Sequence, residues 1–161
     1  MRRATILLFL ALLAAATAQA VMLEVPLETT TSKAVEIVRG EVISQKSAWT
    51  YDNRMIWTDV VVRVDETLKG NLKAGQTVTV RVEGGVAEGI RVRVEHEPRF
   101  HDAEKVVLFL RESSEGGYAV QSVEQGKFTV FDDVVYDCRG HSQSLSRFKN
   151  SIAAMVGQDQ R

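Results

Sequence analysis

The sequence has almost no cysteine. Its 161 residues contain a single thiol, Cys138, so no disulfide can form within the chain. A domain without such a cross-link has to be held together by its hydrophobic core, unless the thiol pairs with another chain or a ligand. Free cysteines are commonly small buried apolar groups, and we therefore expect Cys138 to be buried or simply unpaired.

The sequence also lacks an excess of charge of one sign. It has 20 Lys and Arg against 21 Asp and Glu, and the basic residues are scattered singly, as at Arg81, Arg91 and Arg93. Nucleic-acid binding proteins instead show a clustered basic stripe or an interleaved stacking platform. The slightly acidic balance also disfavours an anionic membrane surface. We therefore expect no nucleic-acid partner.

Recognisable catalytic motifs are absent as well. The sequence contains no nucleophile elbow, no phosphate loop, no H-E-x-x-H and no dinucleotide fingerprint. The glycine-rich stretch from Glu83 to Gly89 joins two predicted strands and opens no helix, so it lacks the positive helix end that a phosphate site uses. These absences predict a chain that is not an enzyme and needs no cofactor.

The only long apolar run lies at the amino terminus. Arg2 and Arg3 precede an apolar run from Ile6 to Ala16, and Ala18-Gln19-Ala20 ends the segment. Such a run is too short to span a bilayer comfortably, and small residues at its end suit signal peptidase. We predict a secretory signal peptide over residues 1–20, cleaved after Ala20, and a periplasmic or secreted mature chain without a membrane span. A retained membrane anchor is the alternative.

What the sequence does contain is alternation of apolar and polar residues, the period of a half-buried strand. Three segments show it, and the glycine-rich stretch between the second and the third predicts a hairpin. The inward positions are Ile56, Thr58, Val60, Val62 and Val64 in the first, Val78, Val80 and Val82 in the second, and Ile90, Val92 and Val94 in the third.

A further segment, Lys105–Arg111, is apolar on both faces and predicts a central strand covered on both sides. Short strands are also predicted at 117–123 and 126–131, separated from their neighbours by "ESSEGG" and "EQG". Short strands at this spacing are typical of an antiparallel barrel or a sandwich, and alternation alone does not distinguish the two. The fold class is therefore mainly β.

The two ends of the mature chain differ from this pattern. Residues 21–33 predict an amino-terminal arm or a short first turn, and residues 34–161 predict a single domain. Its last part, about 144–156, carries an apolar stripe at helical spacing, formed by Leu145, Phe148, Ile152, Met155 and Val156. We expect this C-terminal helix to close the domain; a helix that binds a partner is the alternative.

Two loops hold all three histidines and the cysteine. His96 and His101 are five residues apart, which places them on opposite faces of a strand, and Pro98 would break a helix. Cys138 and His141 have the C-x-x-H spacing of half a zinc site. If the two loops met, the four side chains would form a metal site, and a metal-assisted hydrolase would be possible. A solvated polar loop is the simpler interpretation of residues 95–102.

Aromatic residues gather around one polar turn. Trp49, Tyr51 and Trp57 flank Asp52 and Asn53 between the first two predicted strands. Exposed aromatic side chains on a loop are common binding anchors. The alternative is that both tryptophans plug the end of the barrel.

The order of segments resembles a known family. The stretches "VRGEVIS", "SAW", "TDVVVRVDETLKG", "QTVTVRVEGG", "PRF", "EKVVLFLR" and "GKFTV" are similar to those of uncharacterised secreted bacterial proteins. More distantly they resemble the OB-type barrel of netrin-like modules and tissue inhibitors of metalloproteinases. The resemblance implies an OB-like barrel of five or six strands with an accessory helix, and a protein-binding role. Those inhibitors use an amino-terminal cysteine to cap zinc, and this chain has none before Cys138.

The leading hypothesis from the sequence is thus an exported, non-enzymatic binding module that engages another extracytoplasmic protein, with a protease as one candidate, through the aromatic loop from Ser47 to Trp57. A metal-binding hydrolase that uses the histidine and cysteine loops is the rival. A structural component of the cell envelope is the third possibility.

Overall fold

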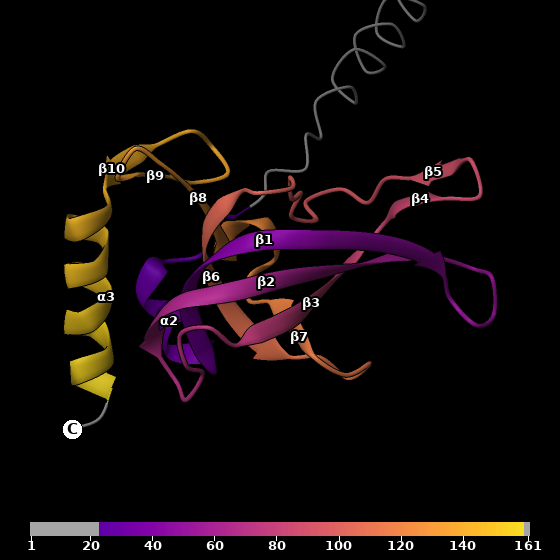
Figure 1. Cartoon of the computed structure of the whole chain (residues 1–161). Helices are drawn as coiled ribbons and strands as arrows, with labels where there is room; N and C mark the ends of the chain where they lie inside the picture. Colours follow the sequence, from indigo (N-terminus) through magenta and orange to yellow (C-terminus); the bar gives the residue numbers. More distant parts are fainter. Residues whose placement is uncertain (1–22, 160–161) are drawn as a thin grey trace, which may run out of the picture.

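The computed structural model describes residues 23–159 (Figure 1). The predicted signal peptide and its cleavage point lie outside these residues. Within them no helix is both long and apolar enough to cross a membrane. The elements are α2 (Leu27–Lys33), β1 (Glu36–Trp49), β2 (Ile56–Lys69), β3 (Thr77–Glu83), β4 (Gly85–Ala87), β5 (Ile90–Val92), β6 (Lys105–Glu112), β7 (Tyr118–Val120), the 3-10 helix η2 (Val123–Gly126), β8 (Lys127–Phe131), β9 (Val134–Tyr136), β10 (Ser142–Ser144) and α3 (Leu145–Asp159).

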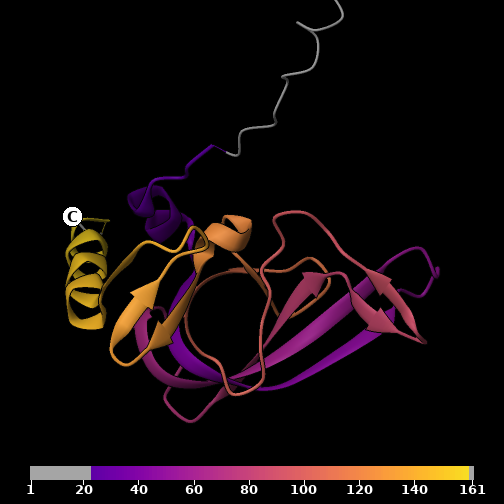
Figure 2. The same ribbon diagram turned by 90° about the horizontal axis from the view of Figure 1, so that it is seen from above.

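Five strands close into a barrel in the order β1-β2-β3-β7-β6, and pairing of β6 with β1 completes the ring (Figure 2). All these pairings are antiparallel except that of β3 with β7, which is parallel and joins Val80 to Tyr118. The mainly β prediction, the OB-like barrel and the C-terminal helix are confirmed. Closure also decides between the barrel and the sandwich that the sequence left open.

The first strand, β1, bends, and it therefore pairs with β2 on one side and with β6 on the other. β1 pairs with β2 from Ile37 to Trp49 and with β6 only from Glu36 to Glu41, and its pairing with β2 shifts register at three places between Ile37 and Ser44. Such bulges bend a strand and increase its twist. At Gly40 a Cβ atom would press on the carbonyl oxygen of Arg63 and approach Val62 Cγ1 to 2.9 Å. Glycine is therefore required where the bend brings β2 closest.

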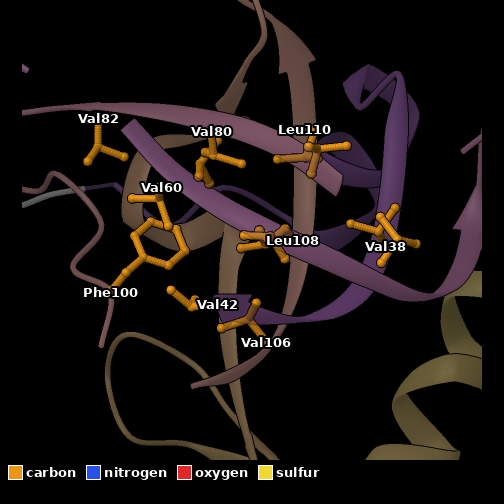
Figure 3. Packing of buried hydrophobic residues seen from close by; sticks show 13 residues of the cluster. Val38, Val42, Val60, Val80, Val82, Phe100, Val106, Leu108 and Leu110 are labelled. Atoms are coloured by element: carbon orange, nitrogen blue, oxygen red, sulfur yellow. The ribbon is translucent and has the colours of Figure 1, made fainter. Parts of the chain in front are cut away.

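The predicted central strand, β6, is covered on both sides, as its sequence indicated. Val106, Leu108 and Leu110 face the barrel interior with the valines of β1, β2 and β3 (Figure 3). Val107 and Phe109 face the other way, into a second core formed with β8, β9 and α3. All five side chains are fully buried.

The C-terminal helix supplies that second core. Phe148 is fully buried, with its ring centroid 4.7 Å from that of Phe128 and 6.3 Å from that of Phe109. The helix begins at Leu145 and runs on to Asp159, beyond the predicted end near residue 156. Within the predicted amino-terminal segment, residues 21–33, the structure places α2, whose Thr30 and Thr31 are buried.

The third predicted strand exists in part, as β5 in a hairpin with β4, but the prediction that its apolar side chains face the barrel interior is wrong. The residues after Gly84 form β4 and β5, a separate two-stranded sheet outside the barrel, and Ile90, predicted to point inward, is 52% exposed. The reason is tertiary: the free edge of β3 is taken by β7, a segment distant in the sequence. The turn within the glycine-rich stretch Glu83–Gly89 is also shorter than expected, because Gly85–Ala87 forms strand β4.

Candidate functional site

The aromatic residues lie on an arm that projects from the barrel. We use the name arm for residues 44–61, in which the end of β1 pairs with the start of β2 beyond the point where β1 leaves β6. In both views the turn at the tip of the arm and α3 lie at opposite ends of the molecule (Figures 1 and 2). The aromatic residues are therefore well separated from the second core.

The turn of the arm is built by its own polar side chains. Thr50 N donates to Met55 O at 2.8 Å, and the Thr50 hydroxyl donates to Asp52 Oδ1 at 2.6 Å. That hydrogen bond is the main reason why the pKa of Asp52 lies below its ordinary value. Asn53 takes a left-handed conformation with φ of 53°, which asparagine tolerates better than most residues. Asp52 and Asn53 therefore shape the turn, and Tyr51 between Thr50 and Asp52 is fully exposed.

Neither tryptophan plugs the barrel. Trp49 and Trp57 are half-buried and lie outside both hydrophobic cores. Both line a hollow of about 370 Å³. Trp57 pairs with Ala48 of β1 and Glu83 of β3, and these residues lie on the outer face of the sheet. We therefore call this hollow the outer hollow. Its lining residues are Lys46, Ala48, Trp49, Thr50, Tyr51, Trp57, Asp59, Arg81 and Glu115.

One wall of the outer hollow is a rigid ion pair. Arg81 donates to both carboxylate oxygens of Asp59, at 2.7 and 3.1 Å, and also to the carbonyl oxygen of Glu115 at 3.1 Å. The bidentate contact with Asp59 raises the pKa of Arg81. Arg81, one of the basic residues scattered singly along the sequence, therefore holds the wall of the outer hollow in place next to Trp57.

A second hollow, the inner hollow, lies on the opposite face of the arm. It has a volume of about 390 Å³ and is bounded by the arm, by β4 and β5, and by residues 93–102. The Ser47 and Thr58 hydroxyls are 2.8 Å apart, and Thr58 donates to Gly84 O at 2.7 Å, which ties the arm to the start of β4. Arg91, Arg93 and Arg99 line this hollow, so basic residues that are scattered singly in the sequence lie together here.

Two carboxylates of the inner hollow are already engaged. Glu97 Oε1 accepts a hydrogen bond from Glu83 N at 2.9 Å, and burial raises the pKa of Glu97. Asp102 Oδ1 accepts from Gln45 Nε2 at 2.9 Å. By contrast, among residues 23–159 the three arginines have no ion-pair partner. Their guanidinium groups are the arginine cations of the inner hollow; of the carboxylates that line it, Glu83, Glu97 and Asp102 have no ion-pair partner among the described residues either, and Glu97 and Asp102 are held by neutral donors.

The predicted metal ligands do not form one site. His96 Nδ1 lies 3.1 Å from Glu124 Oε1, and His141 Nδ1 lies 2.9 Å from Asp137 Oδ2. His101 lines the inner hollow instead. In the part of the chain that the structure describes, no three His, Cys, Asp or Glu side chains are grouped so that they could hold a metal ion.

Of the two expectations for Cys138, a buried thiol or an unpaired one, the structure shows the second: the cysteine is free and exposed. Partial burial of its sulfur and the nearby carboxylates of Glu124 and Asp137 raise the pKa of the Cys138 thiol, which disfavours the reactive thiolate. Beside it, Asp137 is partly buried, which alone would raise its pKa. Hydrogen bonds from His141 and Arg139 outweigh this effect and lower it. The loop from Asp137 to His141 is thus a hydrogen-bonded turn.

No protein-family model matches this chain, and a search of curated proteins finds no match either. The two hollows and the arm are the features of the molecule that indicate a function.

Proposed function

We propose that this chain is an exported, non-enzymatic binding module whose partner is another extracytoplasmic protein, and that the arm carries the interface. The observation that supports this most strongly is the exposure of Tyr51 beside a hollow lined by both tryptophans of the chain. Tyr, Trp and Arg are the residues most enriched at the energetic centres of protein interfaces.

The arm has no need of its aromatic residues for stability of the barrel. Both cores are filled by Val, Leu, Ile and Phe side chains from other positions, and Trp49 and Trp57 belong to neither. Exposing large aromatic surface to water is unfavourable unless a partner covers it. The side chains that the arm exposes are therefore best explained by a bound protein.

The outer hollow is also preorganised for binding. The Arg81 guanidinium is held at three points by Asp59 and Glu115, so it loses little freedom when a partner arrives. Lys46 at the rim adds a cation that has no ion-pair partner among the described residues. A partner with an apolar anchor surrounded by polar or acidic groups would match this surface.

Site-specific crosslinking tests the proposal. A photoreactive phenylalanine analogue in place of Tyr51 should capture one protein from the extracytoplasmic fraction of the source organism in a saturable manner. The same analogue in place of Ala154, an exposed residue of α3 at the opposite end of the molecule, is the matched control and should not capture it. A protease among the captured proteins would make an inhibition assay the next step.

Truncation of the aromatic side chains of the arm provides a second test. Trp57→Ala should abolish capture at Tyr51, whereas Phe131→Ala, which removes another exposed aromatic ring far from the arm, should leave it unchanged. Equal capture by the folded Trp57→Ala and Trp49→Ala variants would show that the arm is not the interface. Loss of capture only in Phe131→Ala would move the interface to β8.

A further inference from the structure

The arm has an unpaired strand edge. The outer edge of β1 is paired as far as Val42, whose N–H donates to Glu104 O and whose carbonyl accepts from Ala103 N, both at 2.9 Å. Beyond a bulge between Val42 and Ser44, β1 continues to Trp49 with β2 alone. The chain before β6 turns away from β1 here, and Gln45 makes the last side-chain contact with it, at Asp102.

The register identifies the free backbone groups. Thr50 N donates to Met55 O, and in an antiparallel pair the backbone groups of every second residue point to the partner strand. Ala48, Lys46 and Ser44 therefore face β2, and Gln45, Ser47 and Trp49 face away. Among residues 23–159, no backbone hydrogen bond reaches the outward groups of these three residues.

The free edge runs between the two hollows. Gln45 and Ser47 line the inner hollow, whereas Lys46 and Ala48 line the outer hollow. β4 approaches the inner face through Ser47 and Thr58 without pairing with β1, because β4 and β5 form a sheet of their own. A strand added to the edge would send alternate side chains to opposite faces, and hence into the two hollows in turn.

From this arrangement we infer that the partner binds as an extended peptide segment that adds a strand to the free edge of β1 at Gln45–Trp49. This inference rests on the proposed function, since it specifies how the arm holds its protein partner. Backbone hydrogen bonds hold the segment, and the hollows on either side select alternate side chains. The edge is long enough to pair about five residues.

The hollows define the chemistry of the segment. Residues that face the outer hollow are large and apolar, because Trp57, Trp49 and Tyr51 line it. Residues that face the inner hollow are acidic, because three arginines line it, while two of its carboxylates, those of Glu97 and Asp102, already accept hydrogen bonds from Glu83 N and Gln45 Nε2. A second copy of β1 does not fit this description, since its edge segment, Ile43–Trp49, contains no acidic residue.

The probe is a set of fluorescein-labelled eight-residue peptides that alternate acidic residues with Phe, Leu, Val or Trp, measured by fluorescence anisotropy with the purified protein. Peptides of the same composition in scrambled order are the control. Alternating peptides should bind and scrambled ones should not. Equal binding of both sets, or no binding at the highest soluble concentration, would overturn the inference.

N-methylation of the peptide tests whether backbone hydrogen bonds hold it on the edge of β1. N-methylation of the peptide nitrogens that face the edge should each reduce affinity roughly tenfold, because one hydrogen bond and close approach are lost, whereas N-methylation of the nitrogens between them should change it less than about twofold. If the loss of affinity does not alternate between successive nitrogens, strand addition is overturned. If peptide binding in that case still depends on Trp57, the proposed function of the arm stands.

A variant of the protein tests the same edge. Gln45→Pro removes an outward N–H that has no partner in the fold, so the barrel should keep its circular dichroism spectrum while peptide affinity falls roughly tenfold or more. Gln45→Ala keeps the N–H and is the matched control. If Gln45→Pro does not fold, the N-methyl scan still decides. A dimer in sedimentation experiments that Gln45→Pro dissociates would assign the edge to a second copy and overturn the inference.

Discussion

Replacement of Gly85 by alanine tests how the wall of the inner hollow is held. Gly85 has φ of 136°, a conformation that side-chain-bearing residues rarely adopt. A Cβ atom at this position would fall on the hydroxyl oxygens of Thr58 and Ser47, and would lie 2.9 Å from Ser47 Cβ. The contact is with partly buried groups of the arm and not with a mobile side chain. The variant must therefore either strain its backbone or separate β4 from the arm.

The expected loss of stability has two components. An alanine with positive φ costs about 1–2 kcal/mol relative to glycine, and overpacking of a close contact costs about 1–3 kcal/mol. Displacing Thr58 would also weaken its hydrogen bonds with Ser47 and Gly84 O, at 2.8 and 2.7 Å. We expect Gly85→Ala to lower the free energy of unfolding by about 2–5 kcal/mol.

The matched control is Gly89→Ala in the turn of the same hairpin. Gly89 also has positive φ, 79°, but a Cβ atom there would meet nothing within 4 Å. It should lose only the conformational component, about 1–2 kcal/mol. Urea denaturation followed by tryptophan fluorescence measures both variants, since Trp49 and Trp57 lie on the arm. Equal destabilisation by the two variants would refute the close approach of β4 to the arm.

Two further predictions concern the other end of the molecule. Phe148→Ala should lower the free energy of unfolding by about 3–5 kcal/mol in chemical denaturation, because the ring is fully buried against Phe128, and a loss below about 1 kcal/mol would contradict that packing. Asp137 has a folded-state pKa below its ordinary value of 3.8, so its contribution to stability is present above that pH and is lost as the pH falls through the lower folded-state value. Asp137→Asn should therefore destabilise the protein at pH 7, and its melting temperature should approach that of the wild type in acid. Thermal melts over a range of pH measure this. A difference in melting temperature that is the same at all pH values would argue against the hydrogen bonds that Asp137 accepts from His141 and Arg139.

The barrel strands were predictable because their signal is local. Alternation from Ile56 to Val64 and from Val78 to Val82 marked the faces that the structure buries. The uninterrupted apolar run of β6 likewise indicated burial on both faces, and Val106 and Val107 do face different cores. A side chain's face on a strand follows from its sequence position, so these features needed no knowledge of the neighbours.

The failures arose where a distant segment decided the outcome. Ile90 and Val92 alternate as a barrel strand would, but β7 occupies the place beside β3. The tryptophans were equally consistent with a plug and with an exposed anchor, and only the projection of the arm beyond β6 distinguishes the two. The loops of His96 and His141 had ligand-like residues, yet each ring meets a carboxylate nearby, Glu124 or Asp137.

The sequence by itself determined the mainly β class, the positions of the principal strands, their buried faces, the C-terminal helix and the aromatic turn. Only the tertiary structure decided that the barrel closes, that β1 outruns β6 and leaves a free edge, and that Arg91, Arg93 and Arg99 gather at one hollow. The physical reason is that periodicity encodes which side of a strand is buried, whereas strand order and edges depend on pairing between residues far apart in the chain.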